Sequence, residues 1–131
     1  MDVPEWIVDA KSPLDAKLGL RLVEVTPRRA VGRYPVAGNT QPAGRWHGGA
    51  TCVAAEAVAS VAAWAEVGPD GSAVGVELNA SHLRAARGEW VEATATAVRI
   101  GRTLATYEVR LDDGTAADPV AVARVTLSLR R

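Results

Sequence analysis

One stretch, from His47 to Glu66 (HGGATCVAAEAVASVAAWAE), constrains the fold more than any other. Eight of the residues between Ala50 and Glu66 are alanine, the strongest helix former, so this stretch is predicted to be one long helix. Gly48-Gly49 opens the helix, and Gly68-Pro69 ends it. Apolar residues lie on every side, and a helix that is apolar all round is usually buried.

A single carboxylate, that of Glu56, lies in the middle of this helix. A buried ionised carboxylate is costly unless it is paired or hydrogen-bonded, so Glu56 is either satisfied by a partner or used in chemistry. A lone glutamate in an alanine-rich helix is more often exposed than catalytic, but the apolar surroundings bring the two interpretations close to even. Ser60 lies one turn later on the same face. Cys52 lies one turn earlier and is expected to be a small buried apolar residue.

The start of the helix offers a second chemical feature. Gly48-Gly49 leaves backbone N–H groups free at the positive end of the helix dipole, where a developing oxyanion is stabilised. However, Gly48 and Glu56 are separated by about 12 Å along a helix axis, too far for one carbonyl to contact both easily. Two antiparallel copies of the helix would bring the start of one to the carboxylate of the other. We therefore predict an active site shared between two chains.

The rest of the chain is predicted to be mainly β-structure. In the first predicted strand, Leu20, Leu22 and Glu24 are expected on one face and Val25 on the other. Residues 7–16 are expected to form a short amphipathic helix, with Leu14 and Leu18 as anchors. The predicted strands are rich in β-branched and aromatic residues and cover residues 18–25, 30–36, 72–84, 89–99, 103–112 and 120–130.

This order of elements predicts an α+β fold in which an antiparallel β-sheet wraps around one long central helix, within a single domain spanning residues 1–131. One helix covers only one face of the sheet, which makes a dimer the expected assembly.

Charge and cysteine content limit the partners and the compartment. Fifteen basic and fifteen acidic residues give a formal net charge of zero, which argues against nucleic acid or an anionic membrane as the main partner. The single cysteine, Cys52, cannot form an internal disulfide, so a cytoplasmic location is expected. The first residues, MDVPEWIVDAK, do not have the pattern of a signal peptide. The central helix is interrupted by Glu56 and is mostly alanine, so a membrane span is disfavoured.

Three motifs together resemble a known family, the hotdog-fold acyl-CoA thioesterases. Gln41-Pro42-x-Gly44-x-x-His47-Gly48-Gly49-Ala50, followed by Glu56 and Ser60, is similar to the subgroup whose catalytic acid is a glutamate on the central helix. That subgroup includes 4-hydroxybenzoyl-CoA thioesterase of the Arthrobacter type, the enterobactin proofreading thioesterase and 1,4-dihydroxy-2-naphthoyl-CoA thioesterase. The stretch from Val74 to Arg84 resembles the strand after the helix in these enzymes, and Ile100-Gly101-Arg102 resembles their Leu-Gly-Arg near the CoA nucleotide.

The resemblance implies a hotdog fold and hydrolysis of an acyl-CoA thioester, with an aromatic acyl group as the family-level expectation. Glu56 would act as nucleophile or as general base, and these two roles stay open. The Gly48 N–H would polarise the thioester carbonyl, with support from the Gln41 side chain. Ser60 would orient the carboxylate or the attacking water. His47 would hold the Gln41 loop or help to expel the thiolate.

The resemblance also implies contacts, assembly and cofactor use. It implies no metal and no redox cofactor, and a dimer with shared sites that pairs further into a homotetramer. An acyl carrier protein is a related thioester donor. Two other classes are weighed: a non-catalytic hotdog module that binds or senses acyl-CoA, which would not need Glu56, and a hotdog dehydratase or hydratase, whose His–Asp pair is not found. The residues expected to contact pantetheine or the CoA phosphates are Gly49, His82, Arg84, Gly101 and Arg102.

Overall fold

The structure is a computed structural model that describes residues 2–10 and 12–131. Its elements follow the predicted order of two strands, one long helix and four strands, after two short N-terminal helices. The helices are α1 (Glu5–Val8), α2 (Pro13–Leu18) and α3 (Gly48–Val67). The strands are β1 (Arg21–Val25), β2 (Arg29–Pro35), β3 (Ser72–His82), β4 (Trp90–Ile100), β5 (Leu104–Asp112) and β6 (Ala121–Arg130).

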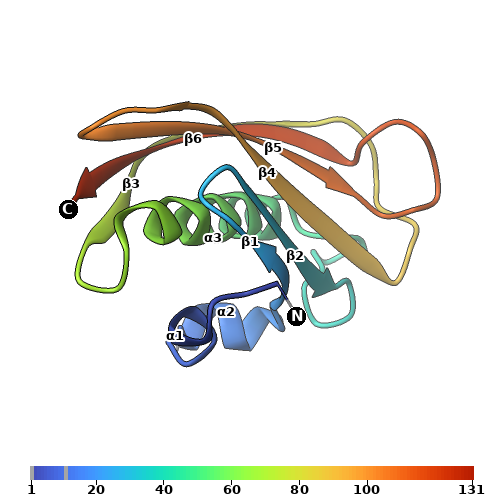
Figure 1. Cartoon of the computed structure of the whole chain (residues 1–131). Helices are drawn as coiled ribbons and strands as arrows, with labels where there is room; N and C mark the ends of the chain where they lie inside the picture. Colours follow the sequence, from blue (N-terminus) through green and yellow to red (C-terminus); the bar gives the residue numbers. More distant parts are fainter. Residues whose placement is uncertain (1, 11) are drawn as a thin grey trace.

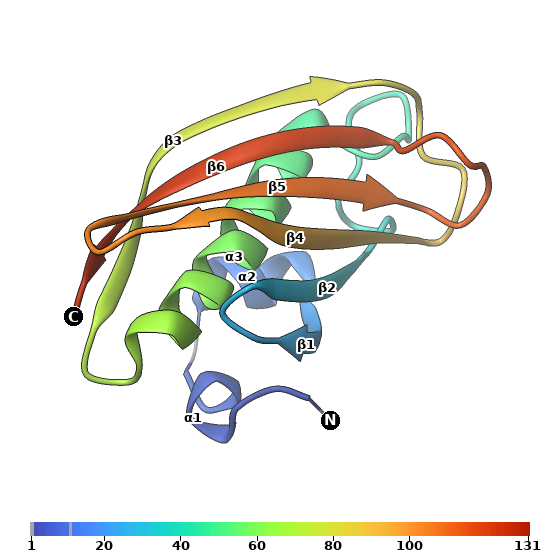
Figure 2. The same ribbon diagram turned by 45° about the horizontal axis from the view of Figure 1, so that its top comes forward.

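All six strands form one antiparallel sheet in the order β1-β2-β4-β5-β6-β3, and this sheet curls around α3 (Figures 1 and 2). The predicted α+β architecture is therefore confirmed. The last five predicted strands agree with the observed ones to within two residues at each end. Their β-branched and aromatic content, broken by clear turn residues, is why they were predictable.

The N-terminal region differs from the prediction of one helix over residues 7–16. Two short helices form instead, because Pro13 starts α2 behind the N-cap Ser12, whose hydroxyl accepts the Asp15 N–H at 3.4 Å. Lys11, inside the predicted helix, lies outside the described residues. Leu14, expected as an anchor, is 53% exposed, whereas Ile7 in α1 is buried.

Strand β1 contains a β-bulge between Leu22 and Glu24. An extra residue in a strand shifts the alternation of its side chains by one position. As a result Val25 is buried in the core, towards which Leu22 also packs, while Val23 is exposed. The predicted placement of Leu22 and Val25 on opposite faces is therefore wrong.

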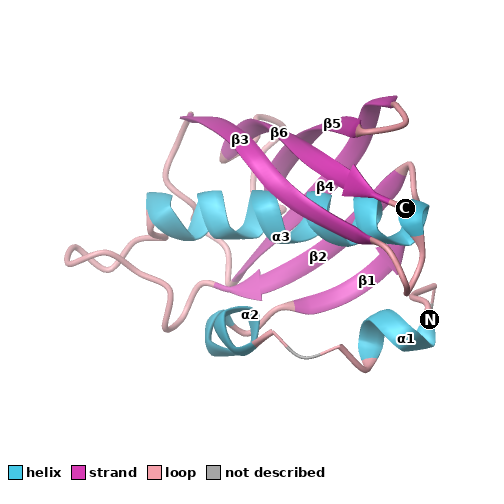
Figure 3. Ribbon diagram, turned by 90° about the vertical axis from the view of Figure 1, so that its left-hand side faces the viewer, coloured by secondary structure: helices cyan, strands magenta, loops and turns pink. Residues whose placement is uncertain are grey.

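The helix α3 is buried on one face only. The residues that face the sheet are small and share almost complete burial: Ala50, Thr51, Ala54, Ala55, Val58, Ala59, Ala62 and Ala63. On the other face Ser60, Val61 and Trp64 are half-buried, Cys52 is also half-buried rather than buried, and Glu56 is exposed. The expectation of burial on every side is therefore wrong for a single chain, because the sheet covers one side of the helix (Figure 3). By length and composition α3 could cross a membrane, but here its inner face forms the protein core.

The two edges of the sheet differ in whether other parts of the chain contact them. Beside β1, Asp2 forms a β-bridge with Glu24, and the backbone carbonyl of Asp2 accepts the Val25 N–H at 2.8 Å. No strand of the described residues pairs with the outer edge of β3, where Val74 and Val76 are 60% and 57% exposed. An edge with unpaired backbone groups and exposed valines is a surface suited to pairing with another strand.

Candidate active site

The start of α3 presents one free backbone donor. His47 is the N-cap residue, and its Nδ1 accepts the Gly49 N–H at 2.8 Å, which places the proton of a neutral imidazole on Nε2. The Ala50 and Thr51 N–H groups donate to the His47 carbonyl. Among the described residues, nothing accepts the Gly48 N–H. This N–H therefore stands at the positive end of the helix with its hydrogen-bonding capacity unused.

The loop before α3 is held by residues that the sequence prediction missed. Asn39 is buried; its side-chain Nδ2 donates to the carbonyls of Leu18 (2.7 Å) and Pro35 (2.8 Å), and its own carbonyl accepts the His47 N–H at 2.9 Å. The signal was Gly38-Asn39, a pair typical of turns. This anchor fixes His47, and hence the first turn of α3, relative to β2.

Gln41 is turned so that its side-chain nitrogen is available. Its Oε1 accepts the Ala43 N–H, and its backbone N–H donates to the Arg45 carbonyl at 2.8 Å. No described residue accepts from the side-chain amide nitrogen, so Gln41 can act as a hydrogen-bond donor to a bound molecule. The side chain is half-buried, in the loop that leads to Gly48.

The Glu56 carboxylate lies against a glycine of β3. A Cβ atom added at Gly75 would stand 2.7 Å from Glu56 Oε2 and 3.0 Å from its Cδ. Gly75 is therefore a further site residue, and a glycine between two valines of a strand was a signal of close approach that could have found it. Ser60 shares the face of Glu56, as expected, but no hydrogen bond joins these two described side chains.

Gly75→Ala is expected to lower kcat of any reaction that uses Glu56 by about 10- to 100-fold, because the carboxylate must move off the β3 backbone. The melting temperature should change little, since only the flexible end of an exposed side chain has to shift. Steady-state kinetics and thermal unfolding check this. Gly38→Ala is unsuitable as a control because Gly38 has a positive φ, so Ala73→Gly on the same strand is used. An active Gly75→Ala chain would show that the carboxylate position is not critical.

The expected substrate contacts lie at opposite ends of α3. His82, at the end of β3, packs on the helix start, where a Cβ added at Gly48 would lie 3.1 Å from its Cε1. Gly101 and Arg102 form the β4–β5 turn, and their carbonyls accept from the Arg131 guanidinium, which also pairs with Glu66 in the last turn of α3. One chain therefore does not bring His82 and Arg102 together. Nor does one chain bring Gly48 to Glu56, which lies two helical turns further on.

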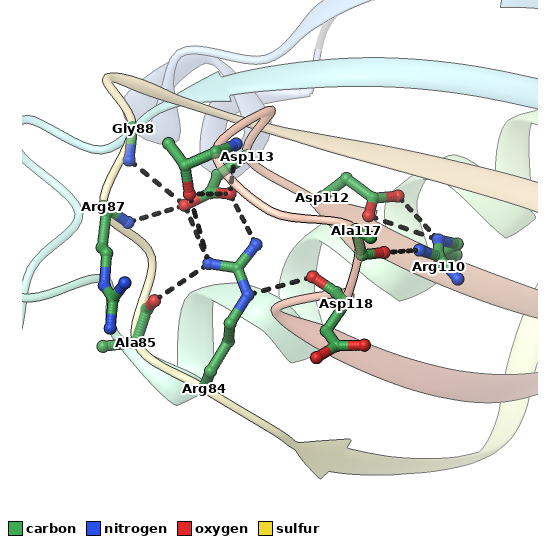
Figure 4. A network of polar contacts seen from close by, with 10 residues as sticks. Arg84, Ala85, Arg87, Gly88, Arg110, Asp112, Asp113, Ala117 and Asp118 are labelled. Atoms are coloured by element: carbon green, nitrogen blue, oxygen red, sulfur yellow. Dashed lines mark hydrogen bonds and ion pairs between the residues drawn. The ribbon is translucent and has the colours of Figure 1, made fainter.

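Arg84 does not have the free guanidinium expected of a substrate contact. It forms a two-pronged ion pair with Asp113, at 2.7 and 3.2 Å, and its Nε donates to the Asp118 carbonyl at 2.9 Å (Figure 4). In this structure the Arg84 guanidinium is thus engaged within the chain, and its expected contact with CoA phosphates stays a prediction. The resemblance could align Arg84 with a strand of the family. It could not show that Arg84 pairs with the Asp113 carboxylate, which comes 29 residues later in the chain.

Asp113 stays ionised because of this pair. The Arg84 guanidinium, with help from the Arg87 N–H and from Thr115, holds the pKa of the Asp113 carboxyl well below its usual range against the opposing effect of burial. Since the folded-state pKa lies below the unfolded value of about 3.9, Asp113 stabilises the fold above pH 4, and this stabilisation is lost as the pH falls further. Wild type should therefore begin to lose its stability advantage over Asp113→Asn as the pH falls below about 5, and the advantage should keep shrinking down to the lowest pH measured.

Urea unfolding at several pH values measures this loss. Asp112→Asn is the matched control, because Asp112 pairs with Arg110 on the surface and should contribute little at any pH. A constant difference between wild type and Asp113→Asn across this range would contradict the assignment.

The fold and this site together define the class of protein. A curled antiparallel sheet around one long helix is a hotdog fold, and here it presents a free N–H at the helix start and a carboxylate on the open face of the helix. The chain belongs to the thioesterase superfamily, whose model matches residues 43–119. It is accordingly a thioester hydrolase. Among the described residues, no cluster of three His, Cys, Asp or Glu side chains is placed to hold a metal ion.

Individual relatives agree with this membership. A Deinococcus radiodurans protein named as a candidate esterase is 45% identical over 101 residues, 76% of this chain but 64% of its own length. The 1,4-dihydroxy-2-naphthoyl-CoA hydrolase of Listeria monocytogenes is 33% identical over 119 residues, 90% of this chain and 96% of its own. A crystal structure of a thioesterase from Pseudomonas aeruginosa, with one glutamine replaced by alanine, has a TM-score of 0.88 and 31% identity, covering 99% of this chain and 94% of that one.

Proposed function

We propose that this protein hydrolyses an aromatic acyl-CoA to the free acid and CoA. The observation that carries this proposal is the pairing of two features of α3, the exposed Glu56 carboxylate and the unused Gly48 N–H. A carboxylate can deliver or become the nucleophile, and an N–H at a helix start can stabilise the oxygen of a thioester under attack. The Listeria relative, named for an aromatic CoA ester, supports the aromatic class.

The two features act together across a dimer. Within one chain Gly48 and Glu56 are about 12 Å apart along the helix, so one chain alone does not bring them together. A second chain whose α3 runs antiparallel to that of the first would place its Gly48 beside Glu56 of the first chain. The unpaired β3 edge with its exposed valines, and the half-buried outer face of α3, supply the surface for that pairing. The same arrangement brings His82 of one chain towards Arg102 of the other, so both ends of the CoA can be held.

Hydrolysis then proceeds by one of two balanced routes. In the first, Glu56 takes a proton from a water whose oxygen attacks the thioester carbon. In the second, a Glu56 oxygen attacks that carbon itself, and water later cleaves the resulting anhydride. In both, the Gly48 N–H and the Gln41 amide stabilise the oxyanion, the C–S bond breaks, and the CoA thiolate leaves and is protonated. Ser60, one turn from Glu56, orients the water or the carboxylate.

A cavity beside α3 is the proposed site for the acyl group. A half-open space of about 720 Å³ lies between α1, α2, β1 and the second half of α3, and its lining is mostly apolar, including Ile7, Leu20 and Leu22. Val61 and Trp64 line this space and also a hollow of about 220 Å³ beside Ser60. Val61 is about 7.5 Å along the helix from Glu56, so an acyl group whose carbonyl is at Glu56 can reach the cavity. The indole of Trp64, held edge-on by Trp6 at 4.8 Å, favours a flat apolar group.

Release of free thiol from a panel of aryl- and alkyl-CoA esters tests the proposal. We expect one aromatic ester to be turned over with a kcat/KM at least about tenfold above that of alkyl esters of similar size. The same acyl groups on an acyl carrier protein test the alternative donor. Saturable binding of esters without turnover would reject the enzyme and favour a module that binds or senses acyl-CoA.

A further inference from the structure

The imidazole of His82 is placed directly over the first residue of α3. A Cβ at Gly48 would lie 3.1 Å from His82 Cε1 and 3.2 Å from its Nε2, so the ring occupies the space that a side chain at Gly48 would need. This is also where the Gly48 N–H is unused. His82 is exposed, so burial does not hold the ring in this position. The position of the ring must therefore depend on the backbone to which it is attached.

The backbone just after His82 is fixed to the residue that precedes β6, the strand that neighbours β3 in the sheet. The N–H groups of Leu83 and Arg84 donate to the Val120 carbonyl at 2.9 and 3.3 Å. The Arg84 side chain then reaches the β5–β6 loop, where it meets Asp113 and the Asp118 carbonyl (Figure 4). Because a planar guanidinium bound on two sides fixes direction as well as distance, Arg84 sets the orientation of the end of β3.

Asp113 is the centre of this cluster. Its side chain is 0% exposed, and besides Arg84 it accepts the N–H groups of Arg87 (2.6 Å) and Gly88 (3.2 Å). Thr115 donates to it through both its N–H and its hydroxyl. One carboxylate therefore joins the β3–β4 connection to the β5–β6 loop, and the segment that carries His82 cannot shift without breaking several charge-assisted hydrogen bonds.

We propose that the Arg84–Asp113 ion pair positions the His82 imidazole over the start of α3, and that this position sets the efficiency of thioester hydrolysis. The proposal rests on the function proposed above. A fixed ring beside the Gly48 N–H keeps water away from the thioester oxygen bound there, and a hydrogen bond to that oxygen is stronger when less water surrounds it. Arg84 and Asp113 are positioning residues, since neither contacts the reacting atoms.

A double-mutant cycle tests this positioning role. Arg84→Lys keeps the charge but loses the two-pronged geometry, and we expect it to lower kcat/KM by about tenfold in an otherwise wild-type chain. In a His82→Ala background the same change should cost less than about twofold, because the group being positioned is absent. Arg110→Lys is the matched control, because the partner of Arg110, Asp112, lies beside Asp113 at the end of β5. It should change kcat/KM in neither background.

A nuclear Overhauser contact between the His82 ring and the Gly48 Hα protons gives a readout independent of activity. It should be present in wild type and in Arg110→Lys, and lost in Arg84→Lys. An unchanged contact in Arg84→Lys, or an equal loss of kcat/KM with and without His82, would overturn the positioning role while thioester hydrolysis stands. A wild-type chain that turns over no ester would instead overturn the proposed function and, with it, the catalytic part of this inference.

Discussion

Replacing Glu56 by glutamine should lower kcat by about 10³-fold, because the amide can neither take a proton from water nor attack a thioester carbon. The side chain is exposed and of nearly unchanged shape, so the melting temperature should stay close to that of wild type. KM should change little if Glu56 acts mainly after the substrate is bound. Thiol release under saturating substrate, beside thermal unfolding, measures both effects.

Glu66→Gln is the control for this substitution. Glu66 lies on the same helix but pairs with Arg131 at its far end, at 2.8 Å, so turnover should persist. A Glu56→Gln chain that keeps kcat within tenfold of wild type would remove Glu56 from the chemistry. A rapid burst of thiol release in wild type, followed by a slower steady rate, would favour direct attack by Glu56 over the general-base route.

Gly48→Pro should lower kcat by about 10²-fold, because proline has no N–H to donate to the oxyanion. Proline is well tolerated at the first residue of a helix, and the backbone of His47, with φ −77° and ψ 130°, already has the extended conformation required before proline. The fold should therefore survive, and the loss should appear in kcat more than in KM.

Gly48→Ala separates loss of the N–H from loss of space. Alanine keeps the N–H but adds a Cβ that presses on the His82 ring, so it reports the steric part alone. We expect Gly48→Ala to lose at most the roughly tenfold that a displaced His82 ring costs, well short of the loss in Gly48→Pro. Equal losses in the two variants would mean that the space in front of the helix, rather than the N–H, matters.

The elements of this fold are encoded locally, and this is why the sequence predicted most of them. The alanine-rich run gave α3, and β-branched runs bounded by turn residues gave β2 to β6. The predicted alternation of side chains in β1 was wrong because the bulge at Val23 depends on pairing with β2, which no local pattern reveals. The expected burial of α3 on every side was wrong for a related reason: how much of a helix is buried depends on what the sheet, and any second chain, covers.

The candidate site was predictable where it depends on residue type and spacing along one helix. Gly48, Glu56 and Ser60 were predicted as site residues in this way. Gly75, Asn39 and Asp113 were not, because each matters through a contact with a residue distant in the sequence. Gly75 was visible as a glycine in a strand, but its significance appears only when the Glu56 carboxylate is seen against it.

Activity of a mixed oligomer tests the shared site most directly. Chains carrying Glu56→Gln and chains carrying Gly48→Pro are co-expressed with different affinity tags, and oligomers that contain both are isolated. If Glu56 of one chain works with Gly48 of its partner, a mixed dimer holds one doubly defective site and one intact site. We then expect about half of the wild-type kcat per dimer. Activity no higher than the mean of the two parent variants would contradict the account and place each site within a single chain.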